Sequence, residues 1–595
     1  MTLGGVLGEA LAANHHGRLS HFITDETSPA IAIFAPEAVA GNEGGDWYGE
    51  HSGKWLAAAA RAGARSGDKA LLGRVRRVAD WLIGHQDPNG YLGNYPLPRR
   101  FTAKHPPKPV SWNGEPSLRT WDIWTHAYLT LGLVELWRVA GDDRYLIAAR
   151  KIGDLVWRTL TEGGLNITDM GNHFGLSATV MLDPALELYF ASGEQRYLDL
   201  ALKIVEQAEG EPHNRLLSQA LAGMDPSEIA TGKAYQLLWN LVGLAKLHRA
   251  TGEAKYLTAV RNLWTAVRDH HLTLGGGPWG GVAHRSREVF NPAAVFDPDG
   301  YVETCSTMAW IQLNRELLGI LGEAQFAQEI ERSAYNDLIG AQAPDGEDWC
   351  YYCFPNGRRV HTTYWRCCKS SGAIAIEELP GVAYAVTADG GVAVNLLGPG
   401  EARFDLPAGA VRLRQETNYP FDGRIEIAVD VDGPAQFPLR VRIPDWAEGA
   451  QLTVAGEAVA AVAGDYVRLD RCWQSGDKVV LMLPMRPVVH RAARRNVQES
   501  LAPDGSPVAQ QVMRYDYLAI TRGPLVQATG LIDGYKLTET LRFDGEPEVE
   551  EVDGMLLLKP QGRAPIPFTP WFSAGARRDG SWRLTWMPLA PEDIG

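Results

Sequence analysis

The chain has 595 residues, 45% hydrophobic and 22% charged, which is the balance of an ordinary globular protein. Its formal net charge of −14 argues against a broad phosphate-binding surface, so neither nucleic acid nor an anionic membrane is an expected partner. No segment reaches membrane-spanning length without charges, and the first residues lack the basic start and apolar run of a secretory signal. We therefore expect a cytoplasmic protein of about two to four domains.

The first half of the chain repeats a pair of helices. In each copy a helix with apolar residues at i, i+3 and i+4 ends at a glycine, an acidic residue follows, and a second amphipathic helix begins. The five glycines are Gly67, Gly141, Gly193, Gly252 and Gly322. Because the intervals between them are long and irregular, they fit a closed ring of helix pairs, an (α/α) toroid, better than a tight solenoid. The loops carry unusual residues, among them Trp121, Asp122, His126, His173, Lys233 and Glu288.

The pattern of the sequence changes after about Pro380. Short runs such as "RIEIAVDVDG" and "FPLRVRIPDW" alternate apolar and polar residues between Gly, Pro and Asp, which is typical of antiparallel strands in a β-sandwich. A looser link, "AARRNVQESLAPDGSPVAQQ", precedes a second strand-rich block. We therefore predict an α+β multidomain protein with a helical toroid over 1–380, a β-sandwich over 381–490 and a second β-rich unit over 491–595.

The six cysteines are too few for a disulfide scaffold, yet two of them are adjacent in "YWRCCKSSG". Adjacent cysteines seldom form a good disulfide, whereas thiolates with a carboxylate make a good zinc site. One ligand set joins Cys350 and Cys353 to Cys367 and Cys368; the other joins Glu303 and Cys305 to the same pair. Spacing alone slightly favours the first set, because C-x-x-C is the commoner metal pattern. Reduced buried thiols without metal are the third option.

Other candidates for chemistry are less specific. Glu288 lies in a polar loop fifteen positions before Glu303 and could act as a general acid if partly desolvated, although a surface position is the simpler interpretation. His126 and His173 follow loops and could face a pocket or be structural. The 19 Trp and 20 Tyr fit core packing and also suit a sugar site. No nucleophile elbow, P-loop or dinucleotide fingerprint is present.

Several motifs occur together in a set order: "GDWYGEHSGKWLAA" around Tyr48, "REVF" ahead of "YVETC", "EDWCYY", "CCKSSG", "LRVRIPDWAEGA" and "AITRGPLVQA". This order resembles glycoside hydrolase family 127, the β-L-arabinofuranosidase family, over nearly the whole chain. The resemblance implies an (α/α)6 barrel followed by β-sandwiches and a zinc-bound cysteine nucleophile. It implies zinc ligands Glu303, Cys305, Cys367 and Cys368, with Cys367 as nucleophile and Glu288 as acid/base. Cys350 and Cys353 would then be bystanders, the reverse of the preference from spacing.

The sequence departs from the pattern of the family at two places. Where the family's arabinofuranosidases have Gly-His-Ala, this chain has Gly232-Lys233-Ala234, and where they have Cys-x-Cys-Cys it reads Trp365-Arg366-Cys367-Cys368. Lys233 and Arg366 make an acidic sugar, such as one from pectin, an alternative substrate. The substrate-binding residues expected from the resemblance and the loops are Tyr48, His126, His173, Lys233 and Arg366.

The leading hypothesis is a zinc-dependent retaining exo-glycosidase that removes a terminal L-arabinofuranose-like sugar from an oligosaccharide. A hydrolase of another sugar with the same residues is the first alternative. A sugar epimerase on the same toroid is the second, and it would need two pocket histidines. A non-catalytic glycan-binding protein with a structural zinc site is the third, with Cys350 and Cys353 holding the metal. A homodimer is left open.

Overall fold

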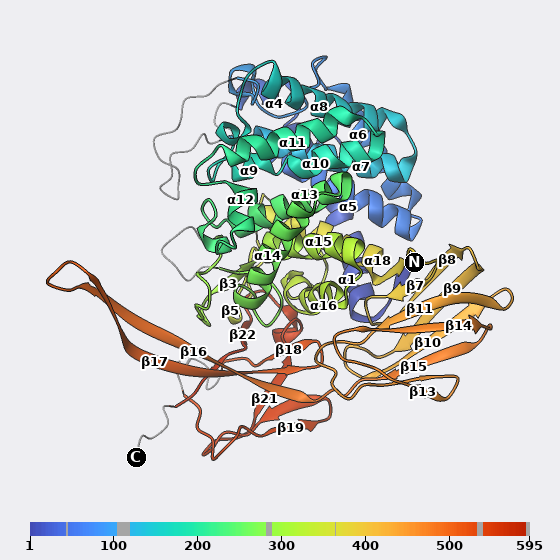
Figure 1. The fold of residues 1–595 in the computed structure, drawn as a ribbon, viewed down its shortest axis with the longest axis vertical. Helices are drawn as coiled ribbons and strands as arrows, with labels where there is room; N and C mark the ends of the chain where they lie inside the picture. The colour runs from blue at the N-terminus through green and yellow to red at the C-terminus, as the bar shows by residue number, and fades with distance from the viewer. Residues whose placement is uncertain (43–45, 104–119, 281–287, 363–364, 532–539, 591–595) are drawn as a thin grey trace.

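The structure is a computed structural model that describes residues 1–42, 46–103, 120–280, 288–362, 365–531 and 540–590. A helical body occupies the N-terminal two thirds of the chain, and the C-terminal third forms β-sheets along one side of it (Figure 1). Among the described residues no helix is both long and apolar enough to cross a membrane.

Six helices of the described chain form an inner ring. They are α5 (Glu50–Ser66), α7 (Asp122–Ala140), α10 (Leu182–Ser192), α13 (Ala234–Thr251), α15 (Thr304–Leu321) and α18 (Cys367–Ala383). Each packs against the next, and α18 packs against α5, which closes the ring. The predicted helical toroid is confirmed in this respect.

An outer helix packs on each inner one. The outer helices are α1 (Gly5–His16), α6 (Lys69–Gly84), α8 (Asp143–Thr161), α11 (Gln195–Glu209), α14 (Ala254–His270) and α16 (Ala324–Ser333). Short helices occupy several connections: α2 (Arg18–His21), α3 (Pro29–Ala32), α4 (Pro36–Gly41), α9 (Leu176–Thr179), α12 (Leu216–Leu221) and α17 (Ile339–Ala341).

The sequence explains which helices lie inside. The inner helices α7 and α13 bury most of their residues on all sides, whereas an outer helix such as α8 buries one apolar stripe and exposes the opposite face. The predicted glycines end the inner helices: Gly67 after α5 and Gly322 after α15 have φ of 71° and 66°, the left-handed conformation that other residues adopt at a cost.

Five of the six inner helices, α5, α7, α13, α15 and α18, begin at the same end of the ring, whereas the second residue of α10, Asp183, lies at the other end. Residues of the first turns of α5, α13 and α18 line one cavity at the first end, while residues near their other ends line a second cavity. Tyr128 of α7 and Trp239 of α13 lie between these cavities, with ring centroids 4.5 Å apart. Helix N-termini carry partial positive charge, so the first end suits carboxylates and thiolates.

The opposite end of the ring contains a network of ion pairs among protein side chains. Lys246 of α13, which is buried, pairs with Asp183 at 2.5 Å and with Glu187 of α10. Arg61 and Arg315 both pair with the buried Glu378 of α18. Each of these charged groups has an oppositely charged partner within the protein, so we assign the network at this end a role in stabilising the fold.

Two packed sheets follow the helical body. One has the order β1 (Thr2–Leu3), β8 (Gly400–Leu406), β9 (Gly409–Thr417), β10 (Arg424–Val431), β15 (Asp477–Met482), β12 (Gln451–Val454) and β13 (Glu457–Val459). The other has the order β14 (Tyr466–Trp473), β11 (Ala435–Arg442), β7 (Val392–Val394) and β6 (Tyr384–Val386). Alternate residues such as Ile425, Ile427 and Val429 of β10 are buried in the shared core, as strand periodicity predicts. The N-terminal strand β1 joins this sheet by pairing with β8, so the first residues of the chain contact the β-region.

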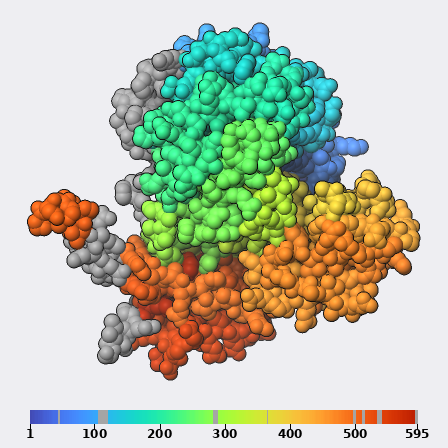
Figure 2. Space-filling model, viewed as in Figure 1, coloured from blue at the N-terminus to red at the C-terminus, as the bar shows by residue number. Residues whose placement is uncertain are grey.

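A third sheet contains most of the remaining strands, while β22 (Trp582–Leu584) pairs with β5 (Asn356–Arg358). The third sheet has the order β16 (Pro487–Leu501), β17 (Pro507–Arg522), β18 (Leu525–Ala528), β21 (Ile566–Pro570), β20 (Met555–Leu558) and β19 (Val549–Val552), with β23 (Met587–Pro588) beside β17. The expectation of a loose link near 492–511 is wrong, because β16 and β17 pair along their length as one hairpin that extends away from the body (Figures 1 and 2). The segment does not show apolar alternation because much of the hairpin lies outside any core.

Candidate active site

A pocket of about 280 Å³ opens at the end of the ring where five of the inner helices begin. Its aromatic lining residues are Trp47, Trp121, Trp124, Tyr235 and Tyr351, and its polar ones are Glu50, His173, Lys233, Gln236, Glu288, Glu303, Arg366 and Cys367. Aromatic faces beside converging carboxyl and amide groups are what a sugar requires, since its ring has apolar C–H surfaces and polar hydroxyls. The volume suits a small ligand.

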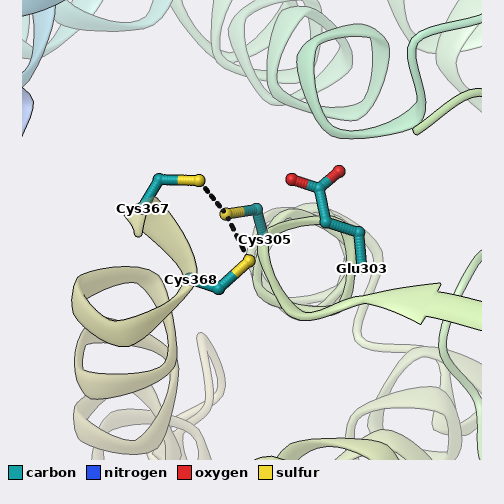
Figure 3. Close-up of side chains that lie close together, drawn as sticks. All are labelled: Glu303, Cys305, Cys367 and Cys368. Atoms are coloured by element: carbon teal, nitrogen blue, oxygen red, sulfur yellow. Dashed lines mark hydrogen bonds between the residues drawn. The ribbon is translucent and has the colours of Figure 1, made fainter. Parts of the chain in front are cut away.

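Two neighbouring helices bring a thiol cluster to this pocket. Glu303 ends strand β3 (Tyr301–Glu303) and is the N-cap of α15, so Cys305 lies in the first turn. Cys367 and Cys368 are the first two residues of α18. The Cys305 Sγ lies 3.4 Å from that of Cys367 and 3.2 Å from that of Cys368, with Glu303 alongside (Figure 3).

The donor atoms of these four residues all lie within 4.8 Å of one another. Tetrahedral zinc with thiolates at about 2.3 Å separates its sulfur ligands by about 3.8 Å, so modest side-chain adjustment would suffice. Three sulfurs and one carboxylate are ligands that zinc accepts. Glu303, Cys305 and Cys368 are buried, whereas Cys367 is partly exposed and lines the pocket. The cluster therefore fits a metal ion with one sulfur facing the pocket.

Without a cation, burial disfavours the anionic forms of Glu303, Cys305 and Cys368. It raises the pKa of Glu303 to about 8, and it raises the pKa values of the Cys305 and Cys368 thiols well above normal. Cys367 differs, because hydrogen bonds from Cys305 and Cys368 hold the pKa of its thiol well below the usual value. A bound dication would offset the burial of the other three groups as anions.

Cys350 and Cys353 do not join the cluster, so the ligand set favoured by spacing is wrong. Strands β3 and β4 (Tyr352–Cys353) pair with Glu303 opposite Tyr352 and Val302 opposite Cys353. Since neighbouring residues of a strand point to opposite faces, Cys353 points away from the face that Glu303 and Tyr352 share. The Cys353 Sγ lies 3.9 Å from the Asp337 carbonyl oxygen in the core. The backbone of Cys350 forms an isolated antiparallel β-bridge with that of His361.

Three donors hold the Glu288 carboxylate at the pocket wall. Lys233 forms an ion pair with one oxygen, and the hydroxyls of Tyr351 and Tyr352 donate to the other at 2.6 and 3.1 Å. Tyr351 also lies 3.4 Å from the Cys367 Sγ, so it touches both predicted catalytic groups. The sequence analysis did not single out these tyrosines, although the motif "EDWCYY" and its place beside β3 are a signal for them.

Lys233 lines the pocket, as predicted, but its charge is directed to protein groups. It is the N-cap of α13, is buried, and reaches the Glu303 carboxylate at 3.4 Å as well as Glu288. Its charge is therefore committed to two protein carboxylates. Arg366, by contrast, is exposed at the rim, and no carboxylate of the described residues lies within 4.0 Å of its guanidinium.

The two predicted histidines differ in position. His173 lines the pocket, bonds to the Thr231 hydroxyl at 2.8 Å, and has its pKa lowered to about 3 by burial and by Lys233, so it is neutral. His126 lies outside the pocket lining. Its Nε2 accepts from the Leu92 N–H at 3.0 Å and its Nδ1 donates to the Asp122 carbonyl at 2.7 Å, which commits both nitrogens to the backbone. The substrate-binding role predicted for His126 does not fit this position.

The predicted Tyr48 also lies outside the pocket lining. It stacks on Trp365 with centroids 4.5 Å apart and packs beside Trp47, which does line the pocket. Sequence reasoning missed Glu50, a fully buried carboxyl two positions further along the same motif. Its signal was an acidic residue at the first position of a helix, where the helix dipole favours a carboxylate.

Comparison with known proteins identifies relatives over nearly the whole chain. The profile of the β-L-arabinofuranosidase GH127 catalytic domain matches residues 8–381, and that of the GH127 middle domain matches residues 391–485. The chain is 23% identical over 529 residues to a non-reducing end β-L-arabinofuranosidase of Bifidobacterium longum subsp. longum, covering 81% of this chain and 75% of that protein.

Two solved structures share the fold over nearly the whole chain. A GH127 β-L-arabinofuranosidase from Geobacillus stearothermophilus T6 superposes with a TM-score of 0.78 at 21% identity, covering 99% of this chain and 100% of that one. A second GH127 β-arabinofuranosidase gives 0.79 at 20% identity, covering 99% and 96%. With the catalytic-domain match spanning more than half of its residues, the chain belongs to glycoside hydrolase family 127, the β-L-arabinofuranosidase family.

Proposed function

We propose that this protein is a retaining exo-glycosidase that releases a terminal L-arabinofuranose-like sugar from oligosaccharides, with Cys367 as the nucleophile. The observation that carries the proposal is the position of Cys367. Of the three clustered cysteines it alone lines the pocket, and its thiol has the lowered pKa. A nucleophile must reach the anomeric carbon as a thiolate, and the place of Cys367 in the lining and the lowered pKa of its thiol support this role.

The chemistry takes two steps. The Cys367 Sγ forms a bond to the anomeric carbon as the glycosidic C–O bond breaks, and Glu288, which enters this step as the neutral carboxylic acid, gives its proton to the departing oxygen. Glu288 then takes a proton from water, whose oxygen bonds to the anomeric carbon as the C–S bond breaks. Tyr351 and Tyr352 keep the Glu288 carboxyl in place, 2.6 and 3.1 Å from their hydroxyls. Two inversions at one carbon retain its configuration.

Zinc is the metal we propose for the cluster, held by Glu303, Cys305, Cys367 and Cys368. When bound, it keeps thiols deprotonated at neutral pH and tempers their basicity. Cys305 and Cys368 orient the site from the buried side, and Cys367 presents its sulfur to the pocket.

The charges around the pocket favour a neutral sugar in it. Glu50, Glu288 and Glu303 all line it, and the Lys233 charge is paired with two of them. Glu50 is likewise paired with Lys54, so neither lysine charge is left over to bind a sugar carboxylate, and the acidic alternative applies only to the rim, beside Arg366. An epimerase would need two pocket histidines, whereas His126 lies outside the lining and His173 has a pKa of about 3.

The test is hydrolysis of aryl L-arabinofuranosides of both anomers, followed by proton NMR of the first sugar released. We expect turnover of the β-anomer, and arabinose that appears first in the β-configuration before mutarotation. Release of the α-anomer first would contradict a covalent intermediate. Binding of arabinosides with no turnover of either anomer would favour the non-catalytic glycan-binding alternative.

The zinc content of cysteine variants distinguishes the glycosidase from the glycan-binding protein without any measurement of turnover. We expect the double variant Cys350→Ser, Cys353→Ser to keep one zinc per chain, because neither thiol lies in the cluster. Cys305→Ser should lose most of its zinc, since it removes one of four ligands. Zinc measured by atomic emission after gel filtration gives the result. Loss of zinc in the double variant, with retention in Cys305→Ser, would contradict the ligand assignment.

A further inference from the structure

A buried ammonium lies beneath the thiol cluster and is not among the groups assigned above. Lys54 of α5 is completely inaccessible to solvent, and its Nζ donates to Glu50 Oε1 at 3.0 Å and to the Ser371 Oγ at 2.8 Å. It also lies over the rings of Tyr128 and Tyr235, 4.5 and 5.6 Å from their centroids. Burying a charge this completely is expensive, so its position calls for an explanation.

Ser371 connects this ammonium to the cluster. It lies in α18 one turn after Cys367, and its Oγ is 3.2 Å from the Cys305 Sγ. Because an ammonium can only donate, the Ser371 oxygen accepts from Lys54, and its single hydroxyl proton is left for another acceptor. Without a metal the Cys305 thiol donates to the Ser371 oxygen. A metal-bound Cys305 thiolate could only accept, and the Ser371 proton would then point at the Cys305 sulfur.

The charges of Lys54 and of the thiol cluster also favour an interaction between them. Burial acts to lower the pKa of Lys54, but Glu50 and the thiols of Cys305 and Cys367 raise it above the ordinary value, so the ammonium stays charged. Three thiolates and the Glu303 carboxylate carry more negative charge than one dication neutralises. A fixed cation on the buried side reduces the excess, and no bulk water is present there to do so.

We propose that Lys54 is a positioning residue for the metal centre: it supplies positive charge beneath the thiolates and turns the Ser371 hydroxyl toward Cys305. The role rests on the proposed metal site. Glu50 keeps the ammonium in place and is the only pocket-lining member of the chain Glu50–Lys54–Ser371–Cys305. Groups that hydrogen-bond to metal ligands tune metal affinity by about 10- to 100-fold.

The fold provides a matched control. Lys246 is also buried and ion-paired on an inner helix, but its partners Asp183 and Glu187 lie at the opposite end of the ring. A lysine that only stabilises the fold should behave like Lys246. A lysine that acts on the cluster should affect metal binding beyond any change in stability.

The experiment measures the zinc Kd by competition with a chromogenic chelator, together with the melting temperature of each metal-free variant. We expect Lys54→Met to weaken zinc binding by about 10- to 100-fold and Ser371→Ala by about 10-fold. Lys54→Arg, which keeps the charge, should retain most of the affinity. Lys246→Met should lower the melting temperature and leave the zinc Kd unchanged.

Glu50→Gln gives the discriminating result. It keeps an acceptor for Lys54 and removes the negative charge that offsets the ammonium, so we expect zinc binding as tight as in the unaltered protein, or tighter. Equal weakening in Glu50→Gln and Lys54→Met would overturn the electrostatic role, as would an unchanged zinc Kd in both Lys54→Met and Ser371→Ala. Should Lys54→Met fail to fold, the zinc Kd values of Ser371→Ala and Glu50→Gln test the proposal without it.

The readout also separates this inference from the proposed function. Zinc affinities with the expected pattern, in a protein that hydrolyses no arabinofuranoside, would remove the proposed activity and keep the role of Lys54. Failure of the unaltered protein to bind zinc would remove both.

Discussion

Replacing Cys367 with Ser is expected to lower kcat on an aryl L-arabinofuranoside by on the order of 10⁴-fold or more. In the proposed mechanism the Cys367 sulfur that lines the pocket is the attacking group, and a serine hydroxyl there would be a far weaker nucleophile at neutral pH. Steady-state kinetics of the purified variant, with its zinc content measured alongside, gives the result. Zinc content matters because the substitution also alters one ligand of the cluster.

Cys472 is the matched control for this variant. It is an exposed free cysteine on β14, in the β-sandwich and outside the pocket lining. Cys472→Ser should leave kcat unchanged. Turnover of Cys367→Ser within tenfold of the unaltered protein would rule out the cysteine mechanism and direct attention to another pocket group.

Replacing Glu288 with Gln should have the second-largest effect, and the size should depend on the leaving group. We expect about a 10²- to 10⁴-fold loss of kcat/KM on an unactivated oligosaccharide, because its departing oxygen needs a proton. A nitrophenyl arabinofuranoside, whose leaving group needs little protonation, should lose much less in the first step. Parallel kinetics on the two substrates measure the difference.

An exposed carboxylate serves as the control for Glu288. Glu448, in the loop between β11 and β12, is exposed and outside the pocket lining, and Glu448→Gln should match the unaltered protein on both substrates. An equal loss on the two substrates in Glu288→Gln would contradict proton donation. It would indicate instead that Glu288 only holds Lys233 and the two tyrosines in place.

Local signals in the sequence were sufficient for the helical part of the fold. Apolar periodicity with a glycine after each inner helix predicted the αα-hairpins, and Gly67 and Gly322 have the left-handed conformation expected of such caps. The β16–β17 hairpin escaped prediction because the side chains described in its projecting part are exposed or half-buried, so they show no buried apolar face. The pairing of β1 with β8 is non-local and carries no local signal.

The site could be predicted only in part, for a physical reason. Glu303 and Cys305 lie some sixty residues before Cys367, and the packing of α15 on α18 brings them together, whereas C-x-x-C spacing drew attention to Cys350 and Cys353. The family resemblance supplied that long-range information. Glu50, Lys54 and Tyr351 become recognisable only when burial and contacts are known. The cytoplasmic location and the homodimer stay predictions.

The most direct measurement of the central claim is peptide mapping by mass spectrometry after reaction of Glu288→Gln with a nitrophenyl β-L-arabinofuranoside. In this variant the first step should proceed with the activated leaving group, while the second lacks its base and the adduct should accumulate. The mechanism predicts one pentosyl group on the peptide that contains Cys367, and none when Cys367→Ser is added. A pentosyl group on a different residue, or release of sugar from Glu288→Gln without any adduct, would contradict a Cys367 nucleophile.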